Sequence, residues 1–204
     1  LEGDPSDVLK LRAMRGRPRF FGAFVEGSEP GVVLDTAGID GARLATVLAW
    51  AEDVFVAEVN DRHPELLVLA YGTNEAFDAG KVDVYGSELV EVLGRLRRGA
   101  PDADCVVLGP PDALDPAGAP LARVAEIAAV YLKTARALGC MFLSGQELMG
   151  GPGSFVEWVQ QRPQLARADR IHLTPLGYRV LGSRFGEELL GEGAAGAAAR
   201  TYSP

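Results

Sequence analysis

The segment D-R-I-H-L-T-P-L-G-Y, residues 169–178, places an acidic residue three positions before a histidine. Both fall in a predicted loop just ahead of a predicted helix, so their side chains can share one pocket. A carboxylate that binds one imidazole nitrogen fixes the tautomer and leaves the other nitrogen free to act as a base. Asp169 and His172 are therefore candidates for the orienting acid and the base of a hydrolase. The alternative is a surface loop with an incidental histidine.

Two glycine-containing segments offer candidate hydrogen-bond donors. In Y-G-T-N-E, residues 71–75, Gly72 allows a tight turn after an apolar run, and Asn74 carries a side-chain amide. In G-I-D-G-A-R, residues 38–43, the Gly41 amide lies near a predicted helix start, where N–H groups are unpaired. Donors aimed at a developing negative oxygen are what acyl transfer needs. Each segment taken alone is equally well explained as an ordinary turn.

The elements that must position these residues follow from four short apolar runs. The runs are nearly continuous rather than alternating, which is typical of parallel strands buried on both faces. They cover residues 31–34, 66–71, 105–108 and 140–143. Between and after these runs, apolar residues recur every three or four positions, which predicts helices from near residue 41 to 59, over 84–98, from 120 to 138, and after residue 174. Thr174 is a candidate N-cap for the last helix, and Pro175 suits its first helical position. We therefore expect an α/β fold with helices on both faces of a parallel sheet, and the motifs above at the carboxyl ends of strands.

Composition excludes some classes of partner. The chain has 204 residues, enough for one domain, and a net charge of −8, which argues against nucleic acid or an anionic membrane surface. It contains no apolar stretch of about 18 residues that would span a membrane, and no signal peptide is visible. Cys105 and Cys140 each begin an apolar run and are predicted to be buried thiols, with a disulfide left open. Two cysteines are too few for a zinc site, and we expect no metal and no cofactor.

Taken together and in this order, the three motifs resemble the blocks of the SGNH, or GDSL-like, hydrolase superfamily. The resemblance covers about residues 31–190 and implies a three-layer αβα fold with a flavodoxin-like parallel sheet. It implies a serine esterase in which His172 is the general base and Asp169 orients it. It also implies that the Gly41 main-chain N–H and the Asn74 amide donate to the oxyanion. Glu75 departs from the family, which usually has Asp at this position, so the contact that it makes is open.

The segments A-Y-G-T-N-E and M-G-G-P-G-S-F-V-E-W resemble those of the branch of this superfamily that deacetylates bacterial cell-wall and other polysaccharides. The resemblance thus implies a small-molecule or polysaccharide ester as substrate and favours an extracytoplasmic location. Glu75, Ser154 and Trp158 are predicted to contact the substrate, although Trp158 is equally explained by packing of a short helix. A non-catalytic carbohydrate-binding module and an acyltransferase on the same scaffold are alternative functions. The sequence does not indicate an oligomeric state.

The nucleophile expected from the resemblance, a serine in G-D-S after an apolar strand, is not found. Ser28 follows an apolar patch, but only twelve residues separate it from Gly41, too few for a crossover helix as well as the strand predicted over 31–34. We therefore expect a fragment that begins after the first block. An inactive or rearranged relative is the alternative.

This interpretation sets the expected domain boundaries. Residues 1–30 would be the end of a preceding β-rich or inserted region, residues 31–190 the catalytic domain, and residues 191–204 a flexible tail. Without the first strand of the family, buried strand edges would lack hydrogen-bond partners. The chain alone is thus expected to be poorly stable unless the apolar patch at 20–25 fills the gap.

Overall fold

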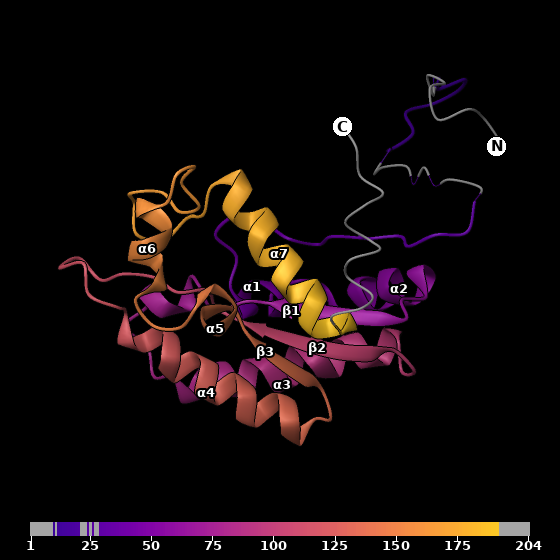
Figure 1. The fold of residues 1–204 in the computed structure, drawn as a ribbon. Helices are drawn as coiled ribbons and strands as arrows, with labels where there is room; N and C mark the ends of the chain where they lie inside the picture. Colours follow the sequence, from indigo (N-terminus) through magenta and orange to yellow (C-terminus); the bar gives the residue numbers. More distant parts are fainter. Residues whose placement is uncertain (1–9, 11, 21–23, 25, 27–28, 192–204) are drawn as a thin grey trace. The chain divides into compact units, whose positions relative to one another are not determined.

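The computed structural model describes residues 10, 12–20, 24, 26 and 29–191 of the chain. It divides into two compact units, residues 1–39 and residues 40–204. The described part of the first unit contains no helix or strand, and all elements named below belong to the second unit (Figure 1).

Three parallel strands form the sheet of the second unit. In the order β1-β2-β3, they are Leu66–Ala70, Asp104–Gly109 and Met141–Ser144. Val68 lies opposite Val106, and Val107 opposite Phe142. The parallel α/β fold is thus confirmed, and three of the four predicted apolar runs are strands with bounds close to those expected. Because the strands run in the same direction, their carboxyl ends meet at one edge of the sheet.

The strand predicted over residues 31–34 is wrong. This segment has no regular secondary structure, and Val32 is 98% exposed. An apolar run becomes a strand only where a neighbouring strand pairs with it, and no described strand does so here. The second compact unit begins at residue 40, and the start of the catalytic domain near residue 31 stays a prediction. The patch at 20–25 and the tail at 191–204 lie largely outside the described residues, so their predicted roles stay predictions.

The described chain also contains seven α-helices and one 3₁₀ turn, of which η1, α3 and α4 lie between strands. They are α1 Leu44–Leu48, α2 Glu52–Arg62, η1 Glu75–Phe77, α3 Asp83–Gly99, α4 Ala122–Ala137, α5 Gly145–Met149, α6 Ser154–Gln160 and α7 Pro175–Leu190. The single helix predicted from near residue 41 to 59 is broken into α1 and α2. Trp50 packs edge-to-face on Phe55, with ring centroids 5.4 Å apart, and Ala51 is extended, so the chain turns between the two helices.

The main apolar core lies between the sheet and the helices α3 and α4. Leu69 of β1, Leu89 of α3 and Ile127 of α4 are at most 4% exposed. In Figure 1, α3 and α4 run along one side of the sheet and α7 lies on the other. On the second face of β1, Leu66 and Val68 are 40% and 45% exposed, as strand alternation requires when that face is only partly covered. No helix in the described part of the chain is both long and apolar enough to cross a membrane.

Cys105 and Cys140 form a disulfide, which corrects the expectation of two free thiols. Val106 pairs with Met141 across the parallel strands, so the residues just before them are also neighbours. Their Cα atoms lie 4.9 Å apart, within the range that a disulfide spans. The bond therefore ties the start of β2 to the start of β3.

Candidate active site

Asp169 and His172 form a hydrogen-bonded pair. Oδ2 of Asp169 lies 3.1 Å from Nδ1 of His172, and Oδ1 accepts the amides of Ile171 and His172 at 3.0 and 2.9 Å. Partial burial raises the pKa of Asp169, but these amide bonds and the contact with the imidazole outweigh it and hold the pKa below its usual value. The carboxylate thus stays charged at neutral pH and can stabilise a protonated imidazole, while Nε2 points to no partner in the described chain.

A short antiparallel hairpin, residues 165–174, holds this pair; we call it the histidine hairpin. Ala166 and Leu173 form a bridge, the Arg167 amide donates to the His172 carbonyl at 2.9 Å, and the Thr174 amide donates to the Leu165 carbonyl at 2.8 Å. The position of His172 is therefore fixed by main-chain bonds on both sides of it.

The histidine hairpin leads directly into α7, as predicted. Thr174 caps the helix by accepting the Gly177 amide at 3.1 Å, and Pro175 takes the first helical position. Gly177 packs so tightly that a Cβ there would collide with the Leu165 carbonyl oxygen. The glycine therefore lets the helix start pack directly against the hairpin.

The hairpin is anchored at the carboxyl edge of the sheet. Leu114, five residues after the end of β2, donates its amide to the Arg170 carbonyl at 3.0 Å. The inward residues of the hairpin also belong to an apolar cluster separate from the main core, which we call the α5–α7 cluster. Its members are Leu114, Met149, Phe155, Trp158, Leu165, Ala166, Leu173 and Leu181.

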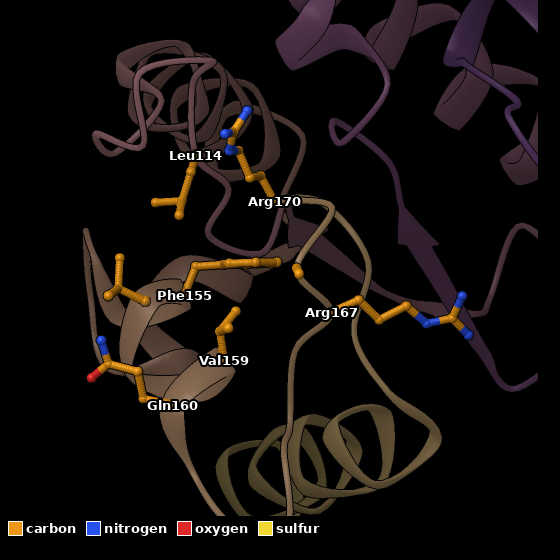
Figure 2. A pocket seen from close by; sticks show the side chains of 8 residues that line it. Leu114, Phe155, Val159, Gln160, Arg167 and Arg170 are labelled. Atoms are coloured by element: carbon orange, nitrogen blue, oxygen red, sulfur yellow. The ribbon is translucent and has the colours of Figure 1, made fainter.

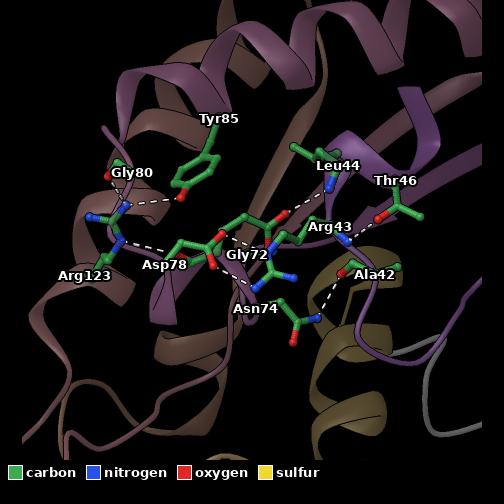
Figure 3. Close-up of polar contacts among 11 residues, drawn as sticks. Ala42, Arg43, Leu44, Thr46, Gly72, Asn74, Asp78, Gly80, Tyr85 and Arg123 are labelled. Carbon is green, nitrogen blue, oxygen red and sulfur yellow. Dashed lines mark hydrogen bonds and ion pairs between the residues drawn. The ribbon is translucent and has the colours of Figure 1, made fainter. Parts of the chain in front are cut away.

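The candidate donors lie after β1, at the same edge. Gly72 has φ +115°, and a Cβ there would lie 2.8 Å from Cδ of Pro110, so the predicted tight turn needs glycine. Nδ2 of Asn74 donates to the Ala42 carbonyl at 2.8 Å (Figure 3). Asn74 therefore lies against the segment that contains Gly41, which is exposed and has φ +74°.

Glu75 joins the two donor segments from within. Its side chain is fully buried, and its oxygens accept the Leu44 amide at 2.9 Å and the Gly72 amide at 3.0 Å (Figure 3). A buried carboxylate with both oxygens bound to the main chain does not face a substrate. The substrate contact predicted for Glu75 is therefore replaced by a positioning role, which links the start of α1 to the turn after β1.

An outer layer of arginines surrounds this link. Nε and Nη2 of Arg43 donate to the two oxygens of Asp78 at 2.8 and 2.7 Å, and this contact holds the pKa of Asp78 below its usual range. Nε of Arg123 donates to the Glu75 carbonyl at 3.2 Å, and its Nη2 donates to the Tyr85 hydroxyl at 3.2 Å (Figure 3). The donor side of the site thus has little freedom to shift.

Comparison with known proteins identifies the family. The chain matches the GDSL-like Lipase/Acylhydrolase family over residues 3–180. It belongs to this family. Its structure resembles that of a peptidoglycan O-acetylesterase with a TM-score of 0.68 and 27% identity, over 74% of this chain and 44% of that one. The chain therefore spans less than half the length of that protein. No curated protein matches it.

Two further structures show the fold alone. A lipase/acylhydrolase from Enterococcus faecalis is 20% identical with a TM-score of 0.55, over 74% of this chain and 72% of that one. An acetyl xylan esterase is 16% identical with a TM-score of 0.56, over 74% of this chain and 78% of that one. The resemblance and the fold class inferred from the sequence motifs are thus confirmed.

Two other residues expected to touch the substrate of this GDSL-like protein are buried. Ser154 is 4% and Trp158 is 2% exposed. Trp158 donates its indole N–H to the Met149 carbonyl at 3.0 Å, within the α5–α7 cluster. The packing alternative therefore describes Trp158 better than a substrate wall, because its ring has almost no surface to offer. The Ser154 hydroxyl has no hydrogen-bond partner in the described chain.

Sequence reasoning missed Asp112. It is fully buried, its Oδ2 accepts the amides of Gly153 and Phe155 at 3.0 and 2.9 Å, and its Oδ1 accepts the Gln146 amide group at 2.8 Å. Asp112 therefore fastens the segment after β2 to α5 and the start of α6. The available signal was an acidic residue soon after a strand, in G-P-P-D.

The described serines are not arranged as a nucleophile. Ser87 and Ser183 lie within α3 and α7, Ser154 is buried, and Ser144 caps α5 by accepting the Glu147 amide at 3.2 Å. Ser6, Ser28 and Ser203 lie outside the described residues. Among the residues that the structure describes, no group of three or more His, Cys, Asp or Glu side chains could hold a metal ion.

Proposed function

We propose that this GDSL-like family member is a serine esterase that removes O-acetyl groups from a carbohydrate, such as a cell-wall polysaccharide. The observation that carries the proposal is the Asp169–His172 pair, 3.1 Å apart in a hairpin anchored to the sheet edge. Asn74 follows β1 at that same edge. An oriented imidazole and amide donors at one edge of a sheet suit acyl transfer.

The proposed reaction assigns each residue one task. Nε2 of His172 takes the proton of a serine hydroxyl as its oxygen attacks the acetyl carbonyl. The Gly41 N–H, the second N–H of the Asn74 amide and the serine's own N–H stabilise the oxyanion. Protonated His172 then donates its proton to the departing sugar oxygen, which leaves an acetyl-serine. Water next attacks this ester while His172 takes the water proton, and the serine oxygen leaves with that proton as acetate is released. We further propose that the serine lies outside the 204 residues, so that this chain alone does not hydrolyse esters.

Two observations support the substrate class and the location. The 27% identity to a peptidoglycan O-acetylesterase supports an acetylated glycan. The disulfide supports an extracytoplasmic location, because disulfides form and persist mainly in oxidising compartments.

Hydrolysis of 4-nitrophenyl acetate and of an acetylated glycan by the full-length protein tests the proposal. The chain has two histidines, which provide a matched pair of variants. We expect His172→Ala to lower kcat by about 10³-fold or more, since it removes the base. His63→Asn, a change at the exposed end of α2 that tolerates a positive φ, should leave kcat unchanged. Equal effects of the two variants would contradict the proposal.

Two other outcomes would assign a different function. Glycan binding without acetate release by the full-length protein would indicate a binding module. Acetyl transfer to a sugar hydroxyl in place of release to water would indicate an acyltransferase on the same scaffold.

A further inference from the structure

Two arginines of the histidine hairpin have no ionic partner. Arg167 and Arg170 are exposed, and neither guanidinium has a hydrogen bond or ion pair with a described residue. Arg43 pairs with Asp78 and Arg98 with Glu52, whereas the exposed Arg136 and Arg179 also lack such a partner among the described residues, so it is their place beside the catalytic pair that sets Arg167 and Arg170 apart. In a chain with 28 acidic residues and a net charge of −8, two unpaired cations beside the catalytic pair form a distinct local charge.

Arg167 lies beside the candidate base. The bridge between Ala166 and Leu173 sets the hairpin register, so the next pair outward is Arg167 and His172, joined by the 2.9 Å amide bond. Residues directly opposite each other in an antiparallel pair project from the same face. Ala166 and Leu173 point inward, so the side chains of Arg167 and His172 leave the outer face together.

Arg170 lies at the tip of the hairpin, beside a pocket. The pocket has a volume of about 190 Å³ and lies between the hairpin and α6 (Figure 2). Its apolar surface comes mainly from Val156 and Val159, because Leu114 and Phe155 are almost fully buried, and Arg167 and Arg170 also line it. Such a wall suits the C–H face of a sugar ring, and the arginine at its rim supplies the charged end of the site.

The two guanidiniums serve different positions of a ligand. In Figure 2, the Arg167 side chain points away from Phe155 and Val159, whereas Arg170 lies next to Leu114. The two guanidinium groups therefore point in different directions, which suits two carboxylates better than one. A polymer with a carboxylate on successive units supplies them, because its charges repeat along the chain.

We infer that the histidine hairpin binds an acidic polysaccharide, with carboxylates of different sugar units on Arg167 and Arg170 and one ring in the pocket. Guanidinium groups bind carboxylates through paired, charge-assisted hydrogen bonds. A neutral glycan would leave both arginines solvated and gain nothing from them. The inference deepens the proposed function and rests on it, because it names the alcohol part of the ester substrate.

Calorimetric titration with two trisaccharides tests the inference. One is α-1,4-linked trigalacturonate, and the other is galactotriose with the same linkage, in which CH₂OH replaces each carboxylate. We expect trigalacturonate to bind at least about tenfold tighter at neutral pH. Raising NaCl from about 50 to about 500 mM should remove most of that difference, because these arginines are exposed to solvent. Equal affinities for the two sugars would overturn the inference.

Replacing each arginine by uncharged glutamine tests which residues cause the preference for trigalacturonate. Arg167→Gln and Arg170→Gln should each weaken trigalacturonate binding by about threefold or more, while leaving galactotriose unchanged. Arg136→Gln removes an exposed arginine from the last turn of α4, at the opposite end of the sheet, and should change the affinity by less than about twofold. Unchanged binding by both hairpin variants, or an equal loss in Arg136→Gln, would overturn the inference.

Turnover of 4-nitrophenyl acetate separates the two proposals, because this ester carries no carboxylate. Hydrolysis without a preference for trigalacturonate would reject only the acidic-polysaccharide site. Selective binding of trigalacturonate without hydrolysis by the full-length protein would reject the esterase and leave the binding site standing.

Discussion

Glu75→Gln is the variant that most directly tests how the donor side of the site is held together. The carboxylate accepts the Leu44 amide at 2.9 Å and the Gly72 amide at 3.0 Å, from segments far apart in the sequence. A carboxamide retains one accepting oxygen and turns the other into a donor. One of the two buried amides would then face another N–H group and lose its partner.

The expected cost follows from these two bonds. A buried donor left without a partner costs about 1–3 kcal/mol, and loss of the charge weakens the remaining bond as well. We therefore expect the free energy of unfolding to fall by about 3 kcal/mol. For a domain of this size, that lowers Tm by about 6–12 °C.

Urea and thermal unfolding of the 204-residue chain measure the effect. Glu126→Gln is the matched control, since Glu126 is exposed on α4 and the same chemical change there should shift stability by less than about 0.5 kcal/mol. Glu75→Asp keeps the charge but shortens the side chain, so its loss should fall between those of the two glutamine variants. In the full-length protein, Glu75→Gln should lower kcat more than it raises KM, because the affected donors act on the transition state.

One result would refute the reasoning: Glu75→Gln as stable as Glu126→Gln. The carboxylate would then not be bridging the two segments, and the positions of Asn74 and Gly41 would have to be fixed by other contacts.

Three further predictions concern other parts of the chain. Folding lowers the pKa of Asp169, so the unfolded state binds more protons than the folded state in acid. The stability that the charged carboxylate contributes is present above about pH 4 and should decline as the pH falls further. Asp169→Asn should flatten this part of a plot of unfolding free energy against pH. Reduction of the Cys105–Cys140 disulfide, which closes a separation of 35 residues, should cost about 3–4 kcal/mol, whereas the double serine variant should not respond to reductant. Gly72→Ala should destabilise by about 2 kcal/mol or more, because φ is +115° and the added Cβ meets Pro110; unchanged urea unfolding would show that the turn can relax.

The sequence predicted the elements whose signals are local. The runs at 66–71, 105–108 and 140–143 are strands because continuous apolar residues can be buried on both faces of a sheet. The run at 31–34 has the same signature but no described partner, and pairing depends on residues far away in the chain. The Thr174 cap was also readable, since it depends only on the next few residues.

The parts that the sequence could not predict depend on tertiary contacts. Glu75 stands in a turn motif like any polar residue, and only the fold brings the Leu44 amide to it from 31 positions away. The disulfide follows from the register of β2 against β3, which no spacing of cysteines reveals. The role of Asp112 could not be predicted for the same reason, because its hydrogen-bond partners come from α5 and the start of α6.

The two apolar clusters divide the candidate site between them. Asn74 and Gly41 are held next to the main core, whereas His172 depends on the α5–α7 cluster, fastened by Asp112 and by the bond from Leu114 to Arg170. The smaller cluster can therefore open locally at a lower free energy than global unfolding. Such an opening would produce a folded but inactive state in which only the base is displaced. Native-state hydrogen exchange would reveal it as amides of the histidine hairpin exchanging sooner than those of β1 and β2.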